Sequence, residues 1–151
     1  MLDDKDRALL RQMQADPTLT VPELAGRAGV SAGQAARRID RMTGDGVIRG
    51  QVAVIDWAAL GYPLQVSLRI TLDKTVPGAF DDFLAAARDV AEVLDIQTFL
   101  GRVDVRLALV ARDLAHYQDV YRHRILSLPH IADIEALMDV ASIKADTRLP
   151  L

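Results

Sequence analysis

Two helix-start signals separated by a glycine constrain the fold of this chain more than any other feature. Thr20 and Glu23 form one capping box of the S/T-x-x-E/Q type, and Ser31 and Gln34 form a second. Gly29 lies between the two boxes, where it can provide the left-handed residue that commonly closes a helix. The pattern predicts two short helices joined by a tight turn, which is a helix-turn-helix.

A further helix is predicted before this pair, and a strand after it. Asp3 is a suitable N-cap, and Asp16-Pro17 ends the helix. The residues between them carry a narrow apolar stripe at helical spacing: Leu2, Leu9, Leu10 and Met13. Residues 47–55 alternate loosely between polar and apolar side chains, which predicts a wing or a linking strand. We therefore expect a winged-type helix-turn-helix domain over residues 1–50.

Arginines concentrate on the second helix of the pair, although the chain as a whole is acidic. The net charge of the chain is −3, whereas residues 27–49 carry five arginines and two aspartates. A helix fits the major groove of DNA, and its N-terminal turn faces the base edges, while arginines along it can hold phosphates. The predicted DNA-binding side chains are Ser31, Gln34, Arg37, Arg38 and Arg41. A plain three-helix packing unit with solvated arginines is the alternative.

Residues 64–151 are predicted to form a second domain, after a linking strand and hinge at residues 51–63. Strands are expected at residues 65–72, 93–100, 105–111 and 131–143, and helices at residues 79–90 and 113–127. This β-α-β-β-α-β order is that of a ferredoxin-like α+β domain, whose sheet has one face without helices. Apolar residues on both faces of the 105–111 strand indicate that a second copy covers the open face. We therefore expect a homodimer.

Taken together, the segments resemble the Lrp/AsnC family, the feast/famine regulators, over essentially the whole chain. The matching stretches are Leu2-Asp3, Asp6, Leu9-Leu10, Glu23-Leu24-Ala25, Gly29-Val30-Ser31, Arg38-Ile39, Met42, Gly46-Val47-Ile48-Arg49-Gly50, Leu60-Gly61, Gly101, Asp104 and Leu128-Pro129-His130-Ile131. The resemblance implies a sequence-specific transcription regulator that binds double-stranded DNA and senses an amino acid or related metabolite. It also implies dimers, which often assemble into octamers.

The resemblance further implies an effector site near a Gly-x-x-Asp turn, where dimers meet. By position the effector residues are Leu100, Gly101, Arg102 and Asp104, with Ala136 on the last strand. Exposed amides beside a glycine can bind a carboxylate, and an Asp can bind an ammonium group. A plain hairpin turn would also favour Gly and Asp at these positions. The sequence departs from the family pattern at His130, where Gly is usual, and at Ala136, where Thr is common. Ala136 has no hydroxyl to reach the effector, which predicts an altered effector or none.

Other classes of protein are disfavoured. The chain has no cysteine and no apolar run long enough to span a membrane, and its acidic N-terminal stretch predicts no signal peptide. His116 and His123 lie two helical turns apart, about 10 Å, too far to share one ion, and His130 follows Pro129. No metal, cofactor or catalytic residue is expected, and the location is expected to be the cytoplasm, on the nucleoid. A tetrapyrrole decarboxylase-like enzyme using His116 or His123, or a metabolite sensor acting on a protein partner, remains open.

Overall fold

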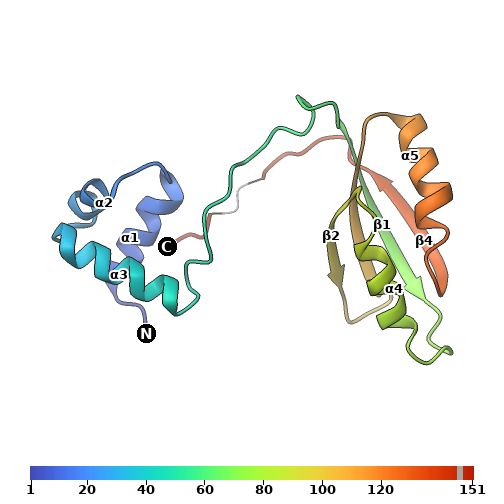
Figure 1. Cartoon of the computed structure of the whole chain (residues 1–151), viewed down its shortest axis with the longest axis horizontal. Coiled ribbons are helices and arrows are strands. Elements are labelled where there is room, and N and C mark those ends of the chain that lie inside the picture. The colour runs from blue at the N-terminus through green and yellow to red at the C-terminus, as the bar shows by residue number, and fades with distance from the viewer. Residues whose placement is uncertain (146–147) are drawn as a thin grey trace. The chain divides into compact units, whose positions relative to one another are not determined.

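The computed structural model describes residues 1–145 and 148–151, and it divides the chain into two compact units (Figure 1). The first unit comprises Met1–Val54 together with Lys144–Leu151, and the second comprises Ile55–Ile143. The sequence division had assigned the C-terminal segment to the second domain.

Three helices form the body of the first unit: α1 (Asp4–Ala15), α2 (Val21–Ala28) and α3 (Ala32–Gly44). All three begin where the capping signals predicted. Ser31 Oγ accepts the amide of Gln34 at 3.3 Å, while Gln34 Oε1 accepts the amide of Ser31 at 3.1 Å. Gly29 closes α2 with a φ of 65°, a left-handed conformation that an L side chain would strain.

The core of the first unit lies where the three helices meet. Its buried members are Leu9, Leu24, Ala25, Ala28, Ala35 and Met42. Ala35 is fully buried, so α3 can approach α2 closely. The C-terminal segment belongs to this unit because it contacts α1: the amide of Leu149 donates to Gln14 Oε1 at 2.7 Å, and Arg11 Nε donates to Leu151 O at 2.8 Å.

The strand predicted at residues 47–55 is wrong. These residues form no strand in the part of the chain that the structure describes, and Val52 and Val54 are almost fully exposed. A strand requires a neighbour to receive its backbone hydrogen bonds, and no described segment of this chain lies in register with it. The helix-turn-helix is therefore followed by an extended segment rather than by a wing.

The second unit is a four-stranded antiparallel sheet with two helices on one face (Figure 1). Its elements in chain order are β1 (Leu64–Leu72), α4 (Ala79–Arg88), β2 (Val93–Thr98), β3 (Val105–Ala111), α5 (Leu114–Val120), the π-helical turn η1 (Tyr121–Ile125) and β4 (Ile131–Met138). The strand order β2-β3-β1-β4 is that of a ferredoxin-like fold. The predicted α+β class and element order are confirmed.

Alternate residues of the two central strands build the core beneath the helices. Leu68 on β1 lies opposite Leu107 on β3, and both are fully buried together with Phe83 of α4 and Ile125 of η1. The last strand is shorter than the predicted 131–143. Its pairing with β1 ends near the start of β1, where the amide of Asp139 donates to Gln65 O at 3.0 Å. The predicted strand residues after Asp139, all of them described, therefore have no further part of β1 to pair with.

Candidate nucleic-acid interface and ligand site

The N-terminal turn of α3 is exposed and carries two of the predicted contact residues. Ser31 and Gln34 satisfy each other's backbone amides through the capping box, which fixes both side chains at the start of the helix. The box uses the amide oxygen of Gln34 and leaves its Nε2 group available to a base edge. Both residues therefore help to begin the helix and are also exposed to a ligand.

Arg37 lies one turn further along α3 and is exposed. Its Nε donates to the Gly33 carbonyl at 3.3 Å, a contact within the helix that leaves the charge of the guanidinium uncompensated. Together with Gln34, Arg38 and Arg41 it lines an open hollow of about 330 Å³ on the surface of the unit. A positively charged hollow along an exposed helix suits a phosphate group or a base edge.

Arg38 and Arg41, by contrast, are held by aspartates of the α1 segment. Arg38 Nη1 lies 2.7 Å from Oδ2 of Asp3 and 2.7 Å from Oδ1 of Asp6, and Arg41 Nη2 donates to Oδ2 of Asp6. Asp6 is fully buried. We call these four residues, Asp3, Asp6, Arg38 and Arg41, the α1–α3 charge cluster.

The charge cluster determines the ionisation of Asp6. Burial by itself raises the pKa of this carboxyl, but hydrogen bonds from the amide of Asp3 and from the guanidinium groups of Arg38 and Arg41 outweigh it and lower the pKa to about 2. From the sequence, Asp6 is one of the acids that favour the dipole of the first helix and one of the family matches, but its contacts with α3 are not predicted. Two sequence features could have pointed to this contact. Asp6 lies three residues after the N-cap, and Arg38 and Arg41 lie about one helical turn apart on a later helix.

The turn that joins β2 to β3 brings together four of the five predicted effector residues. Leu100, Gly101 and Arg102 are exposed, and no atom lies within 4 Å of where a Cβ on Gly101 would be. The turn is tied to β1, since Thr71 Oγ1 donates to the carbonyl of Arg102 at 3.0 Å. Its backbone is thus ordered while its outer surface remains open to a ligand.

Asp104, the fourth residue of the turn, faces the protein rather than solvent. Its side chain is buried; Oδ2 accepts the amide of Leu72 at 2.9 Å, and Oδ1 lies 3.0 Å from Nζ of Lys74. The hydrogen bond from Leu72, opposed by burial and assisted by Lys74, lowers the pKa of Asp104. Lys74 was not singled out from the sequence, and both residues line a hollow of about 340 Å³ beside the β1–α4 loop.

Ala136 does not join this group within one chain. It lies on β4 opposite Leu68 in the middle of β1, whereas the turn is bonded to the C-terminal part of β1, at Ile70 and Leu72. The pairing register therefore places Ala136 away from the bonds that hold the turn.

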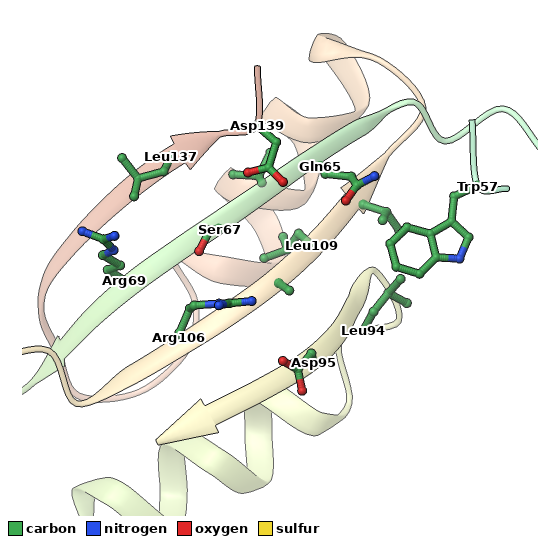
Figure 2. A pocket seen from close by; sticks show the side chains of 13 residues that line it. Trp57, Gln65, Ser67, Arg69, Leu94, Asp95, Arg106, Leu109, Leu137 and Asp139 are labelled. Carbon is green, nitrogen blue, oxygen red and sulfur yellow. The ribbon is translucent and has the colours of Figure 1, made fainter. Parts of the chain in front are cut away.

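The sheet face opposite the helices is hollowed and mixed in character (Figure 2). A pocket of about 580 Å³ is lined by Trp57, Gln65, Ser67, Arg69, Leu94, Asp95, Arg106, Leu137 and Asp139 together with neighbouring positions of β1 and β3. Arg69 lies 3.6 Å from Glu135. Among the described residues, Arg106 Nε is a buried side-chain donor without a hydrogen-bond partner.

Comparison with known proteins matches both units to families. Residues 2–43 match the AsnC-type helix-turn-helix domain, and residues 65–149 match the Lrp/AsnC ligand binding domain. The chain belongs to the Lrp/AsnC family. It is 30% identical over 150 residues to the glutamate uptake regulatory protein of Zymomonas mobilis, covering 99% of this chain and 91% of that one. It is 28% identical over 148 residues to the leucine-responsive regulatory protein of Salmonella typhimurium, covering 98% and 90%.

Solved structures of Lrp/AsnC proteins agree with this assignment. A transcriptional regulator from Neisseria meningitidis, crystallised as a complex with L-Met, superposes with a TM-score of 0.92 at 27% identity, covering 99% of this chain and 97% of that one. An AsnC family transcriptional regulator from Agrobacterium tumefaciens superposes with a TM-score of 0.89 at 32% identity and the same coverage. Family membership makes this Lrp/AsnC chain a transcription regulator rather than an enzyme.

The histidines of this Lrp/AsnC protein lie apart and pair with different acids. His116 lies 3.7 Å from Glu92, His123 lies 2.9 Å from Asp119, and His130 lies 3.2 Å from Asp82. Among residues 1–145 and 148–151, no three metal-ligating side chains converge on one point. No described helix has the length and apolar character needed to cross a bilayer.

Proposed function

We propose that this Lrp/AsnC regulator binds double-stranded DNA at specific sequences through α3 and that a small effector, an amino acid or related metabolite, acts on its C-terminal unit. The DNA-binding part of this proposal rests on the exposed first turn of α3. That turn presents Gln34 and Arg37 beside an open, positively charged hollow. DNA as a partner also places the protein on the nucleoid, in the cytoplasm.

The proposed DNA surface comprises Ser31, Gln34, Arg37, Arg38 and Arg41. Gln34 retains a free amide NH₂ and Arg37 a free guanidinium edge, which suit adenine and guanine edges or phosphate oxygens. Ser31 lies at the helix N-terminus, where the helix dipole favours a phosphate.

The proposed effector surface comprises Leu100, Gly101 and Arg102. The open backbone beside Gly101 and the cation of Arg102 suit a carboxylate, and Arg102 would favour an effector that carries a second acidic group. One relative is named as a regulator of glutamate uptake, and the Neisseria meningitidis regulator was crystallised with L-Met, which supports an amino acid. Asp104 orders this surface through Leu72 and Lys74 rather than contacting the effector.

We propose that a second copy of the chain covers the open face of the sheet. That face carries a hollow, partly apolar surface, and Arg106 Nε is buried there without a partner among the described residues. A buried donor without an acceptor is costly, and an acceptor from a second copy would relieve it. Further assembly of such dimers into an octamer belongs to the same proposal.

DNA binding is tested by measuring the fluorescence anisotropy of the DNA upstream of the protein's own gene as the full chain is added. Titrations at two salt concentrations, with random duplex as competitor, separate specific from general binding. Binding that survives the competitor, weakens with salt and drops in Arg37→Ala supports the proposal. Binding no tighter than to random duplex would contradict it and favour a sensor that acts on a protein partner.

A further inference from the structure

Asp6 is the third residue of α1 and completes a capping box with Asp3, but that role alone does not explain its burial. It lies on α1, outside the predicted DNA surface, and yet its carboxylate is fully buried against two arginines of α3. Each carboxylate oxygen is used: Oδ1 accepts Arg38, and Oδ2 accepts Arg41 and the amide of Asp3. A buried carboxylate with such partners remains charged.

The charge cluster has no net charge. Asp3 and Asp6 contribute two negative charges, and Arg38 and Arg41 contribute two positive charges within hydrogen-bonding distance. The remaining guanidinium donors of both arginines can still form hydrogen bonds, but their charge is offset. Arg37 is the arginine of α3 whose charge no described acid offsets by an ion pair.

This distinction matters because charge and hydrogen bonding affect DNA binding differently. Affinity for any duplex grows with the number of phosphates neutralised, and it falls with salt by a slope of about 0.9 per neutralised phosphate. Hydrogen bonds to base edges discriminate between sequences. An offset charge therefore weakens binding to random duplex more than binding to a selected site.

We propose that Asp6 is a specificity-determining residue of the DNA-binding unit: it holds Arg38 and Arg41 in place on α3 while offsetting their charge, so that Arg37 carries the general attraction to phosphates. This inference rests on the proposed DNA binding and assigns different roles to three arginines that the sequence had grouped together.

The test compares Asp6→Asn with Asp4→Asn in the full chain. Both variants remove one negative charge from the first turns of α1, but Asp4 is exposed and has no ion-pair partner among the described residues. Each is titrated against random duplex and against a duplex that the wild type selects from a randomised pool, over a series of salt concentrations. Thermal melts establish that each variant is folded.

In Asp6→Asn we expect the salt slope on random duplex to steepen by about 0.9 per subunit, with several-fold tighter binding at low salt. The ratio of affinities for selected and random duplex should fall. Asp4→Asn should show a smaller change in slope and an unchanged ratio. Equal behaviour of the two folded variants would overturn the inference and leave the DNA proposal intact, whereas failure of the wild type to select any duplex would overturn the DNA proposal itself.

A second pair of variants keeps the inference testable if Asp6→Asn does not fold. Arg37→Gln should make the salt slope shallower by about 0.9 per subunit. Arg41→Gln leaves Asp6 paired with Arg38 and should lower the slope by clearly less than Arg37→Gln does, because Asp6 already offsets the charge that it removes. An equal loss of slope in both variants would show that Arg41 presents its full charge to DNA, which overturns the inference.

Discussion

Lys74 Nζ lies 3.0 Å from Oδ1 of Asp104, so the acid of the predicted effector turn is already paired within its own chain. The second carboxylate oxygen accepts the amide of Leu72 at 2.9 Å. An Asp that is buried and bonded in this way organises the turn, and we predict that it does not bind the ammonium group of an effector directly. We expect an effector to contact the outer surface of the turn, where Gly101 and Arg102 are exposed.

We expect Asp104→Ala to lower the free energy of unfolding by about 1–3 kcal/mol, because it leaves the buried amide of Leu72 without an acceptor. Asp104→Asn keeps an acceptor oxygen for that amide and should lose less. Urea denaturation of the full chain, followed by circular dichroism, measures the loss in free energy of unfolding for each variant. Equal losses in the two variants would mean that the charge pair with Lys74, not the hydrogen bond to Leu72, stabilises the turn.

The charge cluster predicts acid sensitivity. The pKa of Asp6 falls from 3.8 in an unfolded chain to about 2 in the folded unit, so its contribution to stability is complete above pH 3.8 and is lost as the pH falls toward 2. Other acids with lowered pKa values, such as Asp3 and Asp104, act in the same direction. The difference in stability between wild type and Asp6→Asn isolates the contribution of this residue.

The measurement is the melting temperature of both proteins between about pH 5 and pH 2. The advantage of the wild type over Asp6→Asn should be constant at the upper end and shrink below about pH 4. An advantage that does not change with pH would show that Asp6 acts by shape rather than by charge.

The sequence predicted this fold well where the signal was local. Capping boxes act over three residues, so the starts of α2 and α3 could be located from Thr20 and Ser31, and the alternation of β1 followed from its own residues. The predictions of a strand at residues 47–55 and of a longer β4 were wrong for one reason. A strand needs a neighbouring strand to receive its backbone hydrogen bonds, and that neighbour is distant in sequence.

The same distinction separates the site residues. The exposure of Gln34 and Arg37 follows from helical periodicity, but the pairing of Asp6 with Arg38 and Arg41 joins residues more than thirty positions apart. Lys74 follows β1 and Asp104 precedes the neighbouring strand β3, so this pair also joins residues that are distant in sequence. Sequence spacing can nominate a charged residue, but only the packed structure shows which charges are already paired.

The open sheet face should be the surface that holds two copies together. Leu137 lines its hollow (Figure 2), and Leu137→Asp would place a charge from each copy into the shared surface. We expect dimer affinity to fall roughly 100-fold, since like charges at an interface cost several kcal/mol. Light scattering coupled to size exclusion, over a dilution series, measures this change.

Leu114→Asp is the matched control, because Leu114 is an exposed leucine at the start of α5, on the helix-covered side of the sheet, and it should leave the dimer unchanged. A wild-type protein that is monomeric at micromolar concentration would contradict the proposed dimer. A Leu137→Asp protein that dimerises as tightly as wild type would place the interface elsewhere.

Arg102 should determine which effector this regulator prefers. Its guanidinium is exposed on a turn whose backbone is fixed by Thr71 and Asp104, and no acid of the described residues forms an ion pair with it. We expect isothermal calorimetry to give tighter binding for aspartate or glutamate than for leucine or methionine. Arg102→Gln should remove most of that preference, since an ion pair with hydrogen bonds contributes about 1.5–3 kcal/mol. Binding of the neutral amino acids should change little. Tighter binding of neutral amino acids by the wild type would contradict this role for Arg102. Heat from none of the four would also contradict it, and would favour a different effector or none.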